Sequence, residues 1–223
     1  MITKLHYIIP DSEEFHSRDW YKKICDSGID WIQLRWKSIT DEEFVDRVQD
    51  VQEWTDQFDI RLIVNDRIHL KEQIDVDGYH LGKNDADLKE SRASLGWKSS
   101  DNYREEQGQQ ETKILGGTTN KLDDILKAND AGVDYVGLGP YKFTRTKENL
   151  DPVLGYLGYL NIMRKFGDDS LPVIAIGNIK TKDVQPLLEV GVHGVAVSSY
   201  FNENTENRIK EMLKKLEGNY AFG

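Results

Sequence analysis

Short apolar runs alternate with longer amphipathic stretches along most of the chain. The pattern predicts eight strands, at residues 5–9, 31–35, 61–65, 78–82, 113–118, 135–139, 173–177 and 194–198. In the stretch 41–57, Phe44, Val48 and Val51 recur at helical spacing, and 204–216 is a second clear helical stretch. Strict alternation of strands with helices predicts parallel strands joined by crossover helices.

A weak internal repeat supports this prediction. Gly28, Gly132 and Gly191 each stand where a helix should end, followed by an apolar residue, a polar residue and a strand. Eight such units close into a (β/α)8 TIM barrel, so we expect one α/β domain over 1–223; an open doubly wound sheet is the alternative. The polar, unpatterned stretch 96–112 is expected to be an exposed excursion before the fifth strand.

Composition narrows the classes of function. The 223 residues are 38% hydrophobic and carry a formal net charge of −10. This charge argues against general nucleic-acid binding but allows a local positive cluster that holds a small anion. Cys25 is the only cysteine, which excludes an internal disulfide and suits the cytoplasm. The N-terminus lacks the apolar core of a signal peptide, and no run reaches membrane-spanning length. Small-molecule partners are therefore expected, and a homo-oligomer is left open.

The segment 135–147 is the most informative. A strand-like run with two glycines breaks at Pro140 and opens into a loop that contains Thr144, Thr146 and Lys147. Hydroxyls and cations at the end of a strand indicate an anion cradle. For this loop alone a solvated surface loop is the competing interpretation.

The second strand end has similar chemistry. In a parallel barrel the carboxyl ends of all strands face one mouth, where active sites lie. Gln33, Arg35 and Lys37 fall on one side of their strand by period two. Cations inside a barrel need an anion, which is either a substrate or an internal carboxylate.

Acidic and hydroxyl side chains end the next strands. Asp66 follows Asn65 after the third strand and Asp85 follows the fourth, an arrangement that suits Mg²⁺. Taken alone, Asp85 fits better as a helix N-cap. Thr118 ends the fifth strand, where the neighbouring Thr119 or Asn120 is expected to cap the next helix unless it serves the site.

The last two strand ends indicate a phosphate site. Gly177 and Asn178 follow the seventh strand, and Ser198 and Ser199 follow the eighth. Loops at these positions commonly bind phosphate through backbone N–H groups, although ordinary tight turns are an alternative. Together the strand ends predict a Mg²⁺-bound diphosphate beside a monophosphate.

Over roughly residues 5–200 the sequence resembles the thiamine-phosphate synthase family. The resemblance rests on five ordered motifs, which here read Gln33-x-Arg35-x-Lys37, Asn65-Asp66, His80-Leu81-Gly82-x-x-Asp85, Gly137-x-Gly139-Pro140 and Thr144-x-Thr146-Lys147. It implies a (β/α)8 transferase that couples hydroxymethylpyrimidine diphosphate to thiazole phosphate and releases pyrophosphate and thiamine phosphate.

The resemblance also implies roles for individual residues. Arg35, Lys37, Thr118 and Lys147 are implied to be catalytic, and Asp66 and Asp85 to hold Mg²⁺. The implied substrate-binding residues are Gln33 at the pyrimidine, Arg35, Lys37, Asn65 and Lys147 at the diphosphate, Thr118, Thr144 and Thr146 lining the site, and Gly177, Asn178, Ser198 and Ser199 at the thiazole phosphate.

Three positions depart from the family pattern. Thr118 replaces a usual serine, Asn178 replaces a usual glycine, and Trp36 stands where an acidic residue is common. Two alternatives are therefore kept. One is a thiazole tautomerase-like isomerase with His80 as proton shuttle, and the other is a non-catalytic barrel that binds thiamine phosphates.

Overall fold

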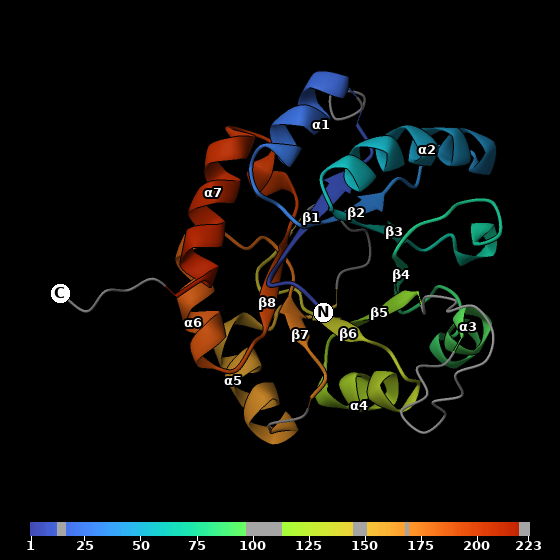
Figure 1. The fold of residues 1–223 in the computed structure, drawn as a ribbon. Helices are drawn as coiled ribbons and strands as arrows, with labels where there is room; N and C mark the ends of the chain where they lie inside the picture. Colours follow the sequence, from blue (N-terminus) through green and yellow to red (C-terminus); the bar gives the residue numbers. More distant parts are fainter. Residues whose placement is uncertain (13–16, 97–112, 145–150, 168–169, 219–223) are drawn as a thin grey trace, which may run out of the picture.

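Eight parallel strands form a closed barrel in a computed structural model of the chain (Figure 1). The structure describes residues 1–12, 17–96, 113–144, 151–167 and 170–218. Each strand pairs with its sequence neighbour, and β1 closes the ring against β8, with Leu5 opposite Val195. The predicted (β/α)8 barrel is confirmed, and the open doubly wound sheet is wrong.

The strands lie within two residues of their predicted positions. Their bounds are β1 Leu5–Pro10, β2 Trp31–Arg35, β3 Arg61–Asn65, β4 Gly78–Leu81, β5 Ile114–Thr119, β6 Tyr135–Leu138, β7 Val173–Ala175 and β8 Gly194–Val197. The short apolar runs therefore form strands that are buried on both faces, as parallel barrels require.

The helices surround the strands (Figure 1). Their bounds are α1 Arg18–Cys25, α2 Asp41–Gln57, α3 Leu88–Leu95, α4 Leu122–Asp130, α5 Gly155–Phe166, α6 Val184–Glu189 and α7 Thr205–Leu216. In α2 the Thr40 side chain caps the first turn by accepting from the Glu43 N–H at 3.2 Å, and Phe44, Val48 and Val51 face the core. Between β3 and β4 the short 3₁₀ helix η2 (Ile68–Leu70) takes the place of an α-helix.

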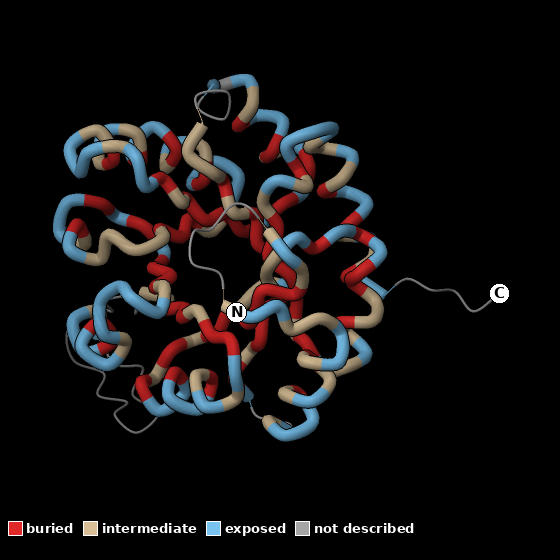
Figure 2. The backbone as a smooth tube through the Cα atoms, turned by 180° about the vertical axis from the view of Figure 1, so that it is seen from behind, coloured by how far each residue is buried: buried red, intermediate tan, exposed pale blue. Residues whose placement is uncertain are grey.

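The core has two layers. The larger layer lies between the strands and the helices, and Figure 2 shows the buried positions gathered on the ring of strands and the inner sides of the helices. The smaller layer fills the barrel interior with Trp31, Tyr135, Ile63, Ile174 and Ala196. The barrel is therefore closed by packed side chains below its mouth.

The internal repeat has a conformational basis. Gly28, Gly132 and Gly191 have φ values of 84°, 78° and 93°, so each ends its helix in a conformation that glycine adopts cheaply. Except for Gly96, the predicted excursion 96–112 lies outside the described residues. The assignment of all of 1–223 to one domain remains a prediction. No helix in the described part of the chain is long and apolar enough to cross a membrane.

Arg92 joins α3 to the amino-terminal ends of β5 and β6. Its guanidinium lies 2.9 Å from the Asp134 carboxylate and donates to the Lys113 carbonyl, and both side chains of the ion pair are buried. Arg92→Met should lower the free energy of unfolding by about 3–5 kcal/mol, because it leaves a buried carboxylate without its cation. Urea unfolding measures this loss. Arg47→Met, which breaks the more exposed pair with Glu43, should cost less than about 1 kcal/mol, and equal losses would contradict the assignment.

Candidate functional site

A cavity of about 700 Å³ opens at the carboxyl ends of the strands. All of the predicted site residues that the structure describes line it: Gln33, Arg35, Lys37, Asn65, Asp66, Asp85, Thr118, Thr144, Gly177, Asn178, Ser198 and Ser199. Thr146 and Lys147 lie outside the described residues, so their placement stays a prediction. The convergence follows from topology, because parallel strands in a closed barrel end at the same face.

The ends of β2 and β3 form a connected polar chain. The Gln33 amide nitrogen donates to the Asn65 side-chain oxygen at 3.2 Å, and the Asn65 amide donates to Asp66. The Asp66 carboxylate also forms an ion pair with the Lys37 ammonium, at 2.7 Å. These hydrogen bonds fix the positions of the amides and the carboxylate. The Lys37 side chain remains half exposed, so its charge can contact a ligand in the cavity.

Asp66 and Asp85 are close enough to share a hydrogen bond. Burial raises the pKa of Asp85 to about 6, and the hydrogen bond and negative charge of Asp66 act in the same direction. Burial also opposes the charge of Asp66, but hydrogen bonds from Asp85 and Lys37 outweigh it and hold the pKa of Asp66 below its ordinary value. A carboxyl pair that resists a second negative charge favours a cation between its members.

Asp85 is not the N-cap of α3. That cap is Asp87, whose side chain accepts from the N–H groups of Lys89 and Glu90. Asp85 instead accepts from the Gly82 N–H at 2.6 Å, which holds its carboxylate at the end of β4. The helix-cap interpretation of Asp85 is therefore wrong.

The end of β5 places a hydroxyl at the cavity. Thr118 lies 3.0 Å from the His80 Nε2, and the His80 Nδ1 lies 3.0 Å from the Tyr135 hydroxyl. Neither Thr119 nor Asn120 caps the following helix, because the N-cap of α4 is Lys121. Both ring nitrogens of His80 are thus engaged by hydroxyls.

The loops after β6 and β7 lie against each other. A Cβ on Gly139 would stand 2.4 Å from the Ile176 carbonyl oxygen, and one on Gly177 would stand 2.7 Å from the Pro140 Cα. The Tyr141 N–H donates to the Ile176 carbonyl at 2.7 Å, across the same contact. These two glycines permit the approach that forms this wall of the cavity.

Asn178 retains a glycine-like backbone. Its φ is 50°, in the left-handed region that asparagine tolerates better than most residues. Its amide donates to the Phe143 carbonyl at 3.0 Å, which directs the side chain towards the loop after β6. Ser198 and Ser199 line the cavity at the end of the neighbouring strand β8, before and within the 3₁₀ helix η4 (Ser199–Phe201).

Comparison with known proteins identifies the family. The family model described as thiamine monophosphate synthase matches residues 5–201. The chain belongs to this family. Among curated relatives it is 37% identical to a thiamine-phosphate synthase of Flavobacterium johnsoniae, over 98% of this chain and 99% of the relative. It is 35% identical to one of Bacteroides fragilis, over 88% of this chain and 91% of the relative.

The family assignment confirms the predicted resemblance, the enzyme class of transferase and the main predicted function. Among solved structures, the thiamine phosphate pyrophosphorylase from Pyrococcus furiosus superposes with a TM-score of 0.77 at 24% identity, covering 96% of each chain. That likeness supports the barrel fold alone. The roles predicted for individual site residues are not tested by these comparisons.

Several residues that line this cavity were not predicted from the sequence. His6 and Tyr135 form the cavity floor, where the His6 ring stacks on Trp31 with centroids 4.1 Å apart. Lys83 also lines the cavity but is paired with Asp124 at 2.8 Å and Asp151 at 3.1 Å. His6 and Tyr135 could have been predicted, because their positions along their strands direct them into the barrel. The ion pairs of Lys83 could not, because nothing in the sequence links Lys83 to acidic residues so far away.

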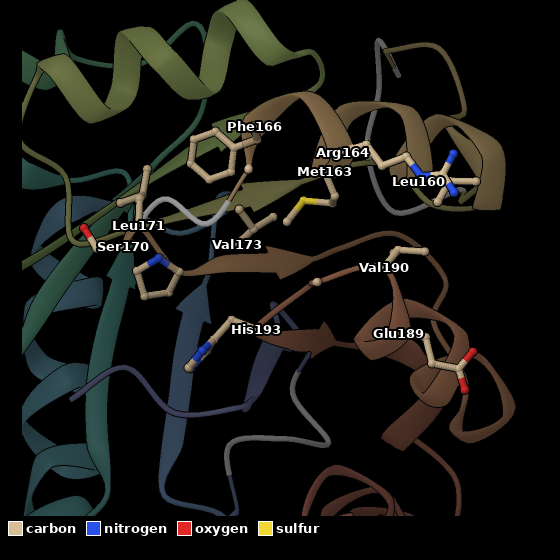
Figure 3. Close-up of a pocket in the computed structure, with 13 residues that line it drawn as sticks. Leu160, Met163, Arg164, Phe166, Ser170, Leu171, Val173, Glu189, Val190 and His193 are labelled. Carbon is tan, nitrogen blue, oxygen red and sulfur yellow. The ribbon is translucent and has the colours of Figure 1, made fainter.

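A second cavity of about 510 Å³ lies between the C-terminal parts of α5 and α6 and the starts of β7 and β8 (Figure 3). Met163, Phe166 and Val173 supply apolar surface there. In Figure 3 the His193 ring and the Glu189 carboxylate point away from each other. Because its polar groups do not converge, this cavity does not compete with the mouth as an active site.

Proposed function

We propose that this protein is a thiamine-phosphate synthase that joins hydroxymethylpyrimidine diphosphate to thiazole phosphate and releases pyrophosphate. The observation that carries the proposal is the single cavity at the strand ends, with cations and carboxylates from β2 to β4 on one side and the loops after β7 and β8 on the other. Two phosphorylated substrates that react with each other need two phosphate-binding regions within one cavity.

The diphosphate is assigned to the ends of β2 and β3. Arg35, Lys37 and Asn65 line the cavity together there, and Lys147 is proposed to join them. The pyrimidine is assigned to Gln33. Its amide nitrogen is already used by Asn65, which leaves its carbonyl oxygen for the amino group of the ring. Thr144 and Thr146 are proposed to line the same side.

Asp66 and Asp85 fit a Mg²⁺ site. The described residues contain no cluster of three or more histidine, cysteine or acidic side chains suited to a metal. Two carboxylates are nevertheless a suitable donor set, because Mg²⁺ usually keeps several waters and binds through one or two carboxylates with substrate phosphates. The raised pKa of Asp85 next to Asp66 supports a cation here. When bound, Mg²⁺ supplies positive charge to the diphosphate oxygens.

The chemistry is proposed to be a dissociative displacement. The carbon–oxygen bond to the diphosphate breaks, and the amino-substituted pyrimidine stabilises the carbocation-like methylene. The thiazole nitrogen then donates its electron pair to that carbon. Arg35, Lys37, Thr118 and Lys147 stabilise the departing negative charge, which is electrostatic catalysis. The thiazole nitrogen is already nucleophilic, so this route needs no strong base.

The thiazole phosphate is assigned to Gly177, Asn178, Ser198 and Ser199. Gly177 and Asn178 both have positive φ values, so the backbone turns sharply after β7, and we propose that N–H groups of this turn face the phosphate. The Asn178 amide is directed to Phe143, so the proposal relies on the backbone and the serine hydroxyls there.

Further parts of the proposal concern partners and location. Small-molecule substrates are proposed, because a net charge of −10 disfavours nucleic acid but allows a local positive cluster that holds a small anion. A cytoplasmic location is proposed, because the single cysteine suits a reducing compartment. A homo-oligomer remains a prediction.

The test is pyrophosphate release with both substrates and Mg²⁺. Release should require both substrates and should stop when excess EDTA is added, because the two carboxylates are assigned to the metal. Full activity in EDTA would contradict the metal assignment. Deuterium uptake from D₂O into a carboxylated thiazole phosphate, without pyrophosphate release, would identify a tautomerase. Tight binding of thiamine phosphate without either reaction would identify a non-catalytic barrel.

A further inference from the structure

We infer that Tyr135 and His80 are positioning residues that fix the Thr118 hydroxyl as a hydrogen-bond donor into the cavity. The three side chains form one chain across β6, β4 and β5, with both contacts at 3.0 Å. Thr118 stands at the cavity end of this chain and Tyr135 at the buried end. The inference rests on the proposed function for the identity of the acceptor, which is an atom of the bound pyrimidine diphosphate.

The donor and acceptor roles in these two hydrogen bonds follow from the phenol of Tyr135. This side chain is 1% exposed, and burial raises its pKa well above the usual value, so the hydroxyl keeps its proton. Within the described part of the chain, this hydroxyl forms its hydrogen bond with the His80 Nδ1. A buried hydroxyl proton without an acceptor is costly, so Tyr135 donates and Nδ1 accepts.

The tautomer of His80 then determines the role of Thr118. With Nδ1 accepting, the ring proton of neutral His80 lies on Nε2, and Nε2 donates to the Thr118 hydroxyl oxygen. The Thr118 proton is therefore directed away from His80. Because Thr118 lines the cavity, its donor is available to substrate.

The packing around Tyr135 holds its ring next to His80. The Tyr135 ring occupies the space where Gly116 would carry a Cβ, with the hydroxyl oxygen 2.6 Å from that position. The rings of Trp31 and His6 also pack against Tyr135, with centroids 5.5 and 5.1 Å from that of Tyr135. A larger residue at position 116 would displace the phenol from His80.

The first test is the tautomer of His80, measured by ¹⁵N NMR of the histidine rings in the resting protein, with His80→Gln used to assign the signal. We expect Nδ1 to be unprotonated and Nε2 protonated, and Tyr135→Phe to remove this preference. The reverse tautomer in the wild type would overturn the inference. This measurement requires no turnover, so it separates failure of the inference from failure of the proposed function.

The second test is a double-mutant cycle on pyrophosphate release. Tyr135→Phe should lower kcat about tenfold, the scale of one hydrogen bond, and Thr118→Val should lower it at least as much. Thr118→Ser should retain most activity. In the Thr118→Val background, Tyr135→Phe should have little further effect, whereas additive losses would overturn the positioning role.

Tyr159→Phe is the matched control. Tyr159 is also buried, and its hydroxyl donates to the Leu138 carbonyl, away from His80. This variant should lose stability of similar size without changing the His80 tautomer. A changed tautomer in Tyr159→Phe would mean that the signal reports general core repacking, and it would overturn the inference.

Discussion

Lys37→Met should lower kcat for pyrophosphate release by about 10²-fold. Lys37 lines the cavity with its ammonium 2.7 Å from Asp66, at the strand end assigned to the diphosphate. In the proposed mechanism its positive charge stabilises the negative charge that grows as the bond to the leaving group breaks. Loss of such an interaction appears mainly in kcat, and removing one preorganised group costs about 10²–10³-fold in comparable sites.

Lys210→Met is the control for charge and exposure. Lys210 is 51% exposed against 54% for Lys37, and it also pairs with a carboxylate, that of Glu206. Its kcat should stay within about twofold of the parent, since a surface pair on α7 contributes little. Equal effects of the two substitutions, or a Lys37 effect confined to KM for thiazole phosphate, would contradict the assignment of Lys37.

Gly177→Ala should destabilise the fold and weaken binding at the end of the cavity that is proposed to hold thiazole phosphate. The residue has a φ of 102°, and a Cβ would lie 2.7 Å from the Pro140 Cα. Backbone strain of this kind costs about 1–3 kcal/mol, and overpacking against backbone adds about 1–3 kcal/mol. Urea unfolding measures the stability loss, and calorimetry measures the weakened binding of thiazole phosphate.

Gly28→Ala separates strain from close approach. Gly28 has a φ of 84°, but a Cβ there would meet its nearest atom, on Leu213, at 3.8 Å, an ordinary contact. We expect this variant to show the strain alone and to bind thiazole phosphate normally. If both variants lost the same stability, the contact between the loops after β6 and β7 would not be as tight as described.

The fold was predictable because pattern and capping agree. α2 lies at its predicted bounds, since Thr40 caps it and its apolar spacing is regular. β7 ends at Ala175, two residues before the predicted end. The reason is a contact that the sequence does not display: the carbonyls of Ile176 and Gly177 accept from the N–H groups of Tyr141 and Lys142 in the neighbouring loop.

The site was predictable as far as topology places strand ends together. That argument brings Lys37, Asp66 and Asp85 to one mouth without any knowledge of side-chain contacts. It does not reveal the link between Tyr135 and His80, which depends on how deep two side chains reach inside the barrel. Nor does it give the direction of the Asn178 amide, which is set by a carbonyl 35 residues away in the chain.

The most direct test of the synthase assignment is ³¹P NMR of one sample containing the protein, Mg²⁺ and both substrates. The signals of pyrophosphate and thiamine phosphate should appear together in equal amounts, while those of the pyrimidine diphosphate and thiazole phosphate decline in parallel. Equal amounts are expected because one bond to diphosphate is exchanged for one bond to the thiazole nitrogen. Pyrophosphate without thiamine phosphate, or unchanged substrates, would contradict the assignment.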